Sequence, residues 1–281
     1  MMFQGRRICG AALLSMALVT EMVAGTAAVA SAEEPSVDEV VERTNRVAYY
    51  QGRDGRARVK MTISDAQDRT RSRAFVILRR DDEIEGDLSD KATGKQKMYV
   101  YFRRPADVNK MVFLVWKEPI GDDDRWLYLP ALDLVKRIAA SDKRTSFVGS
   151  HFFYEDVSGR SPELDHHELV KTSDTYYVIR NTPKDPSSVE FDHYDMWIHR
   201  TSFVPIRTEY FDSAGERTRL YEVLEVKKID GYATIIRSRM SDLRSGGNTL
   251  LEYDSVAYNQ DLPEEVFSER YLRNPPNQYL R

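Results

Sequence analysis

The chain has 281 residues, of which 41% are hydrophobic and 31% charged, and its 41 basic side chains nearly balance 45 acidic ones. Without an overall basic charge, nucleic acid is not an expected partner. The single cysteine excludes a disulfide framework, a cysteine-rich zinc site and an iron–sulfur cluster.

The first 32 residues have the pattern of an export signal. Arg6 and Arg7 precede a short apolar stretch, and small residues follow it up to Ala32. These are the three parts of a secretory signal peptide, so cleavage is expected after Ala32. The apolar stretch is shorter than the ~20 residues that a transmembrane helix needs. The paired arginines leave both Sec and twin-arginine export open. We expect residues 33–281 to form one periplasmic domain.

A helix opens this expected domain. Ser36 and Glu39 form a capping box, which satisfies backbone N–H groups of a first helical turn. Apolar residues then recur at helical spacing. The pattern predicts a helix that runs to about Tyr50 and stops near Gly52.

Beyond Gly55 the period of the apolar residues changes to two, which is typical of strands with one buried face. In the first such segment, Val59 and Met61 flank Lys60. Short turn sequences, such as residues 212–216, separate neighbouring segments as hairpins require. Strands are expected near residues 57–63, 70–80, 96–104, 111–117, 125–130, 134–139, 165–172, 175–181, 188–198, 204–212, 217–227, 232–241 and 249–258.

Helices long enough for repeated parallel crossovers are missing from the pattern, so the sheet should be antiparallel. A second helix is expected around residues 262–271, with Pro263 in its first turn. The predicted fold is mainly β (α+β): a single, strongly curved antiparallel sheet partly wrapped around a few helices. A concave face filled by side chains would make a structural domain, whereas a gap there would make a lipid site.

Residues 122–160 are the most informative part of the sequence. They combine a strand that is apolar on both faces with four aromatic residues in eight positions, between polar flanks. This is more aromatic surface than an ordinary loop exposes without a reason. The aromatic residues of the segment that we consider site candidates are Trp126, Tyr128, Phe147, Phe152, Phe153 and Tyr154.

The same segment carries a family resemblance. Residues 126–138 read W-L-Y-L-P-A-L-x-x-V-x-R-I, and S-D-K, F-x-G-S-x-F and Y-E-D follow up to residue 156. This order resembles the outer-membrane lipoprotein-sorting protein family, which is related to the LolA/LolB lipoprotein carriers. The lead-in at residues 107–116 and the tail at residues 251–263 are also similar to that family.

The resemblance implies a curved antiparallel half-barrel with helices in its concave face and an apolar cavity between them. It also implies a periplasmic role in moving or holding acyl chains of lipids or lipoproteins. Some relatives are associated with inner-membrane exporters of the RND type, so such a transporter is an expected partner. No cofactor is implied.

On this reading the six aromatic residues form the cavity wall and its plug, with Phe152 and Phe153 on a segment that yields to ligand. The two candidates in the strand also fit an ordinary core. Arg137 and Arg144 are candidate contacts for a lipid head group, although each also fits a surface salt bridge. Glu155 and the aspartate after it suit a cap for the plug segment.

Enzyme patterns are weak. The sequence has no H-E-x-x-H motif and no glycine-flanked nucleophilic serine. Asp192, His193 and Asp195 carry metal-binding groups, but alternate positions of a strand point to opposite faces. We expect no metal and no catalysis, and hydrolysis of an envelope lipid at His193 is the weakest reading.

Two hypotheses of different classes remain. The first is a periplasmic carrier of lipid or lipoprotein acyl chains. The second is a non-catalytic adaptor that binds another envelope protein through an edge or a face of the sheet, because an open half-barrel leaves strands unpaired.

Overall fold

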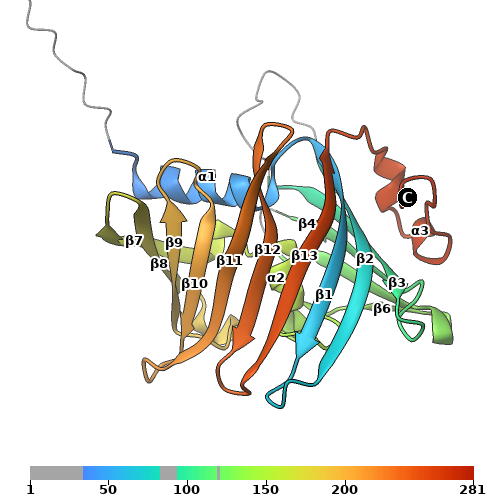
Figure 1. Ribbon diagram of the computed structural model, residues 1–281, viewed down its shortest axis with the longest axis horizontal. Coiled ribbons are helices and arrows are strands. Elements are labelled where there is room, and N and C mark those ends of the chain that lie inside the picture. Colours follow the sequence, from blue (N-terminus) through green and yellow to red (C-terminus); the bar gives the residue numbers. More distant parts are fainter. Residues whose placement is uncertain (1–33, 83–93, 119–120) are drawn as a thin grey trace, which may run out of the picture. The chain divides into compact units, whose positions relative to one another are not determined.

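The computed structural model describes residues 34–82, 94–118 and 121–281 (Figure 1). Pro35–Arg281 form one compact unit. The signal peptide predicted for residues 1–32 lies outside the described residues. Within the described ranges, no helix has the length and apolar character needed to cross a membrane.

One antiparallel sheet of 13 strands forms the body of this unit, as the sequence predicts. Every expected strand is present, with ends shifted by a few residues. The strands are β1 (Asp54–Ser64), β2 (Thr70–Asp81), β3 (Gln96–Arg104), β4 (Val112–Lys117), β5 (Asp124–Leu129), β6 (Leu134–Arg137), β7 (Asp165–Thr172), β8 (Tyr176–Pro183), β9 (His193–His199), β10 (Pro205–Phe211), β11 (Arg217–Ile229), β12 (Tyr232–Asp242) and β13 (Gly247–Tyr258).

The order of the strands is β6-β5-β4-β3-β2-β1-β13-β12-β11-β10-β9-β8-β7, so the first and last strands pair in the middle of the sheet. There Met61 of β1 lies opposite Leu251 of β13. The chain runs outward from β1 to one edge at β6 and must then reach the opposite edge at β7. Residues 138–164, which we call the crossover segment, make this connection and include the short helix α2 (Tyr154–Ser158).

The inner, concave face carries the larger core. On β1, Val59, Met61 and Ile63 point inward, and they join inward side chains of β2 to β5, including Phe102 and Phe113. The crossover segment packs onto this group through Phe147 and Tyr154. Because side chains alternate between the two faces of a strand, every second residue lies on the concave face.

Helix α1 (Val37–Tyr49) covers another part of the inner side (Figure 1). Its first turn is capped as predicted, because the Ser36 hydroxyl accepts a hydrogen bond from the Glu39 N–H at 3.2 Å. Val40 packs with Ile179 and Ile198 of the strands beyond β10. The helix thus lies against the half of the sheet that contains β8 and β9.

The outer face of β2 to β5 is covered by residues 262–281, which we call the C-terminal segment. The sequence predicts one helix over residues 262–271, and this is wrong in detail. The segment forms a 3-10 turn at Glu264–Phe267 and the one-turn helix α3 (Arg270–Arg273). Pro263 immediately precedes the 3-10 turn. The irregular path of the segment is fixed by the burial of five apolar side chains, which are Leu262, Val266, Phe267, Leu272 and Leu280.

Candidate functional site

A cavity of about 340 Å³ lies between the inner face of the sheet, α1 and the crossover segment. Its wall is mostly apolar and draws side chains from both halves of the sheet. Ala48 belongs to α1 and Phe152 to the crossover segment. The strands contribute Met61, Phe75, Met98, Met240 and Leu251, among others.

Aromatic contacts hold the crossover segment against the inner face. The ring of Phe147 lies 5.3 Å from that of Phe113 and 5.6 Å from that of Tyr154, in edge-on arrangements. The ring of Phe152 lies 6.3 Å from that of Tyr221. Such pairs add to the stability gained by burial alone. They also explain why Phe147 and Phe152 form one wall of the cavity.

The loop between these two phenylalanines is tied to strand β13. The Nδ1 atom of His151 lies 2.8 Å from the Thr249 hydroxyl, which also accepts the His151 backbone N–H at 3.0 Å. Gly247 permits this approach, because a Cβ atom there would lie 2.4 Å from Nε2 of His151. Any larger residue at position 247 would displace the imidazole.

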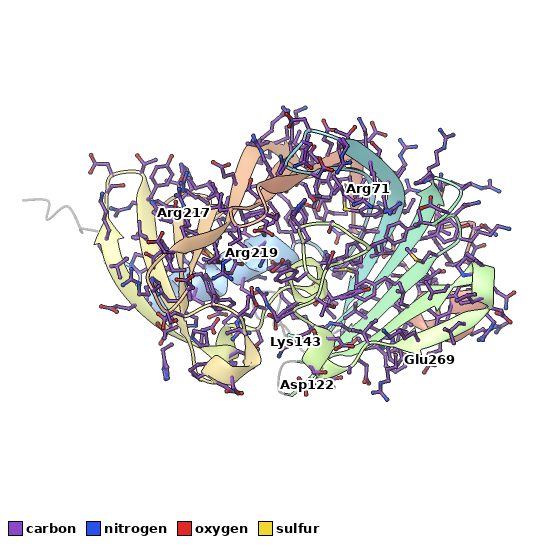
Figure 2. All side chains as sticks on the ribbon, turned by 90° about the horizontal axis from the view of Figure 1, so that it is seen from below. Arg71, Asp122, Lys143, Arg217, Arg219 and Glu269 are labelled. Atoms are coloured by element: carbon purple, nitrogen blue, oxygen red, sulfur yellow. The ribbon has the colours of Figure 1, made fainter. Side chains whose placement is uncertain are left out.

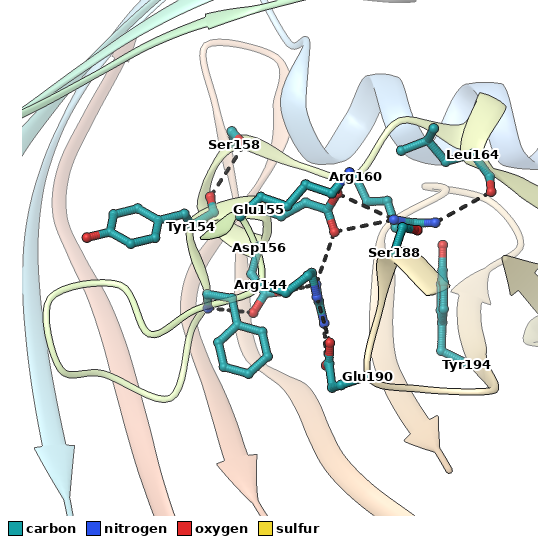
Figure 3. Close-up of polar contacts among 12 residues, drawn as sticks. Arg144, Tyr154, Glu155, Asp156, Ser158, Arg160, Leu164, Ser188, Glu190 and Tyr194 are labelled. Carbon is teal, nitrogen blue, oxygen red and sulfur yellow. Dashed lines mark hydrogen bonds and ion pairs between the residues drawn. The ribbon is translucent and has the colours of Figure 1, made fainter. Parts of the chain in front are cut away.

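Arg144 is the centre of a buried group of charges on the crossover segment (Figure 3). Its guanidinium lies 3.2 Å from Glu155, 3.1 Å from Asp156 and 2.6 Å from Glu190, which precedes β9. Burial opposes its charge, but the carboxylates of Asp156 and Glu190 prevail and hold the pKa of Arg144 above its usual range. The predicted head-group contact is therefore already occupied by three carboxylates of the protein.

Further ion pairs join the crossover segment to the second half of the sheet. Asp156 pairs with Arg219 of β11, which lies inside the curve of the sheet in Figure 2. Burial raises the pKa of Asp156, but Arg219 and Arg144 outweigh it and leave that pKa below its usual value. Arg160 donates to Asp165 at 2.7 Å. These contacts clamp α2 in place, and the Asp156 carboxylate caps the helix by accepting the Phe153 N–H at 2.8 Å.

The candidate residues from the sequence separate into two groups. Phe147, Phe152 and Arg144 line the cavity. Tyr154 lies behind them in the inner core, and the Phe153 ring lies 3.9 Å from the Arg219 guanidinium.

The structure does not bring the other three candidates to the cavity. Trp126 and Tyr128 alternate outward on β5 and pack with the C-terminal segment. Arg137 lies beside Trp126 and pairs with Asp124. Their inward neighbour on the strand is Leu127. Because neighbouring side chains of a strand point to opposite faces, an inward Leu127 would have placed Trp126 and Tyr128 on the outer face.

Sequence reasoning missed the tyrosines of the cavity. Tyr49 of α1, Tyr210 of β10 and Tyr253 of β13 all line it. They are far apart in the chain and belong to no motif. For Tyr253 alone a signal was available, because it lies two positions after Leu251 on β13 and so points to the same face.

The histidine and aspartate residues around β9 contact neighbouring side chains. The ring of His193 stacks on Phe211 at 4.8 Å, and Nδ1 lies 2.8 Å from Asp192. Asp195 accepts two hydrogen bonds from Arg180, each at 2.8 Å. Across the described residues, no group of three potential ligands suited to a metal ion is found.

Solved structures of known proteins share this architecture. A DUF1329 family protein from Desulfovibrio piger matches with a TM-score of 0.73 at 24% identity, over 84% of this chain and 98% of its own. An outer membrane lipoprotein-sorting protein domain from Vibrio parahaemolyticus matches with a TM-score of 0.72 at 26% identity, over 84% and 97%. A LolA superfamily protein from Nitrosomonas europaea matches with a TM-score of 0.64 at 18% identity, over 84% and 99%.

These matches confirm the LolA-like fold and the resemblance to outer-membrane lipoprotein-sorting proteins that the sequence predicts. More particularly, the chain belongs to the family whose model, described as an uncharacterized protein, matches residues 94–274. No curated protein matches the chain.

Proposed function

We propose that this protein is a non-catalytic carrier in the periplasm that holds an acyl chain of a lipid or lipoprotein in the cavity under its crossover segment. One observation carries the proposal: the concave side of a LolA-like sheet is incompletely filled, and the remaining space is about 340 Å³ with a mostly apolar wall. Ligand pockets commonly begin near 300 Å³.

The energy available from this wall suits an acyl chain. Each methylene group removed from water contributes about 0.8 kcal/mol, so even part of a chain would bind usefully. Met61, Met98 and Met240 are unbranched and adapt to ligands of differing shape. Two of the aromatic residues selected from the sequence, Phe147 and Phe152, remain in the proposed site.

Release of the cargo requires the cavity to open. The crossover segment is the movable wall in this proposal. Opening would separate polar contacts that join it to the second half of the sheet, such as that of Arg144 with the partly exposed Glu190. A carrier needs an opening equilibrium of only a few kcal/mol to pass cargo on. Delivery to or from an inner-membrane transporter of the RND type is part of the proposal, as is export through a signal peptide cleaved after Ala32.

An adaptor role is the second candidate, and exposed apolar residues at the sheet edges favour it. Leu132, which precedes β6, is 70% exposed, and Leu134 of β6 is 45% exposed. Leu169 and Val170 of β7 are exposed at the other edge. An extended segment of a partner could add to either edge as a further strand.

Mass spectrometry of protein purified from its native envelope separates the two candidates. The carrier predicts a co-purifying lipid or acylated peptide. Protein that is repeatedly empty but holds a stoichiometric protein partner would instead support the adaptor.

A cavity-filling variant localises the binding. Ala48→Trp places an indole in the cavity, and Ala214→Trp places the same group on the exposed turn between β10 and β11. Binding of the neutral fluorescent probe N-phenyl-1-naphthylamine should fall at least about tenfold in Ala48→Trp and stay unchanged in Ala214→Trp. Equal binding by both variants, with unchanged circular dichroism, would contradict the proposed site.

A further inference from the structure

The charge of the cargo can be inferred from the groups that line the cavity, on the basis of the carrier function proposed above. The ionised side chains of the crossover segment, Arg144, Asp156 and Arg160, are compensated within the protein. A carboxylate of the protein therefore already occupies the position that an acidic head group would need.

The other arginines that line the cavity are also compensated. Arg79 donates to Asp81 at 2.7 Å and to the Tyr49 carbonyl at 3.1 Å. Arg56 donates to the carbonyl of Arg281. Among the described residues that line the cavity, each arginine thus has a carboxylate or carbonyl partner. An ionised group that entered would lose its hydration without gaining an opposite charge.

Three phenolic hydroxyl groups offer a different chemistry. Tyr49, Tyr210 and Tyr253 line the cavity, and no hydrogen-bond partner for their hydroxyls is found within the described ranges. By contrast, Tyr194, which also lines the cavity, donates to Asp165 at 2.8 Å. Polar groups inside native proteins generally have hydrogen-bond partners, and these three hydroxyls border the cavity without one from the protein, so they suit a ligand.

The three hydroxyls are also kept neutral, and the ring of Tyr49 is held in place. Burial raises the pKa of each phenol, and mutual proximity adds to the shift at Tyr49. The Tyr49 ring packs on Gly159, where a Cβ atom would lie 2.9 Å away, and Lys117 lies 5.1 Å from the ring centre. Neutral phenols donate hydrogen bonds to ester, ether and alcohol oxygens.

We propose that the cavity selects an uncharged lipid whose polar group contains a hydrogen-bond acceptor, such as an ester or alcohol oxygen, and disfavours lipids with an ionised group at that point. The phenols of Tyr49, Tyr210 and Tyr253 bind the oxygen, while the paired charges around Arg144 leave no counter-ion for a carboxylate or phosphate.

Ligands with a common ten-carbon chain test this selection. Decan-1-ol, methyl decanoate, decane and decanoate at pH 8 compete with N-phenyl-1-naphthylamine for the full-length protein. The alcohol and the ester should displace the probe at concentrations about tenfold lower than decanoate. Decane, which lacks the acceptor, should lose no affinity when the phenolic hydroxyls are removed.

Variants identify the groups responsible. The triple variant Tyr49→Phe, Tyr210→Phe, Tyr253→Phe keeps the rings and removes the hydroxyls, and its affinity for the alcohol and the ester should fall about tenfold while probe binding stays constant. The matched control, Tyr279→Phe in the C-terminal segment, should bind as the wild type does. Glu190→Gln removes one carboxylate from Arg144, and decanoate binding should strengthen several-fold.

The outcomes distinguish this inference from the carrier function itself. If decanoate competes as well as decanol, or if the triple variant binds decanol as tightly as the wild type, the selection for neutral lipids is overturned although the carrier survives. If neither the probe nor any ten-carbon ligand binds, both proposals fail.

Discussion

The two segments that cover the two faces of the sheet do so by different means. The C-terminal segment lies on the outer face of β2 to β5 and closes it with apolar side chains. Hydrogen bonds add to this cover, among them those from the Tyr99 hydroxyl to the Tyr271 carbonyl and from Trp116 Nε1 to the Phe267 carbonyl, both at 2.7 Å.

The crossover segment covers the inner face with aromatic contacts from its middle and with ion pairs from residues on either side of them. Phe147 packs tightly on β4, whereas Arg144 and Asp156 hold the remainder through charged partners. The cavity lies where the apolar cover stops. The comparison teaches that an apolar cover fills its face, whereas a cover held by directional charges can leave a space behind it.

The largest effect should come from removing the outer cover. Deletion of residues 262–281 exposes the apolar face under five buried side chains, each worth about 1.5–3 kcal/mol. Their sum is close to the whole stability of a typical domain, about 5–15 kcal/mol. We expect insoluble or unfolded protein by solubility and circular dichroism, while the exposed substitution Glu269→Ala changes nothing. A folded deletion variant with an unchanged melting temperature would show that the outer cover is dispensable.

Breaking the inner clamp should have the next largest effect. Asp156→Ala removes a buried carboxylate that pairs with both Arg219 and Arg144 and leaves them only the partly exposed Glu190 in common. The loss of a buried ion partner costs about 3–5 kcal/mol. Urea unfolding measures this loss. Asp254→Ala removes the exposed partner of Arg58 and should change the free energy of unfolding by less than about 1 kcal/mol.

The same clamp predicts acid sensitivity. Because folding lowers the pKa of Asp156 through Arg219 and Arg144, against the effect of burial, its ion pairs stabilise the protein fully above about pH 5. This stabilisation is lost progressively as the pH falls further and the carboxylate takes up a proton. The wild type should therefore lose more stability between pH 5 and 3 than Asp156→Asn. Parallel pH curves for the two proteins would exclude this contribution.

Substitution of Trp126, on the outer face, tests whether the two faces act separately in stability and binding. Trp126 is buried with its ring 4.8 Å from that of Trp116. Trp126→Ala should lower the free energy of unfolding by about 3 kcal/mol, the lower end for a buried aromatic. Probe binding at saturation should stay unchanged, because the cavity lies on the other face. Loss of binding in this variant while it is still folded would place the site elsewhere.

The smallest effect concerns a buried lysine on the inner face. Burial lowers the pKa of Lys117 from its usual value to about 8, although its Nζ donates to the Ser158 carbonyl at 3.1 Å. Between pH 8 and 10 the unfolded chain holds this proton more firmly than the folded one, so stability should rise by about 2 kcal/mol. Lys117→Met should abolish the rise in urea unfolding curves, and an unchanged rise would assign it to another group.

Local patterns were sufficient for most of the fold. The alternation around Val59 and the capping box at Ser36 predict β1 and α1, and the same reasoning finds the remaining strands. The predicted helix at residues 262–271 failed, because burial against the outer face shapes that segment more strongly than its helical spacing does.

The site was only partly predictable. Phe147 and Phe152 lie close together in the chain, and the sequence predicts both as cavity residues, but it does not predict the partners of Arg144. Glu190 lies 46 residues from Arg144 in the chain, so only the path of the crossover segment brings the two together. Sequence spacing carries no information about such pairs.

Pairing of the first and last strands also sets the order in which the molecule can assemble. Val59 of β1 lies opposite Tyr253 of β13, although most of the chain separates them. Contacts of such long sequence separation form slowly, because the entropy of closing a large loop is lost first. The two central strands therefore cannot pair until β13 has been synthesised, and the sheet remains incomplete at its centre until then.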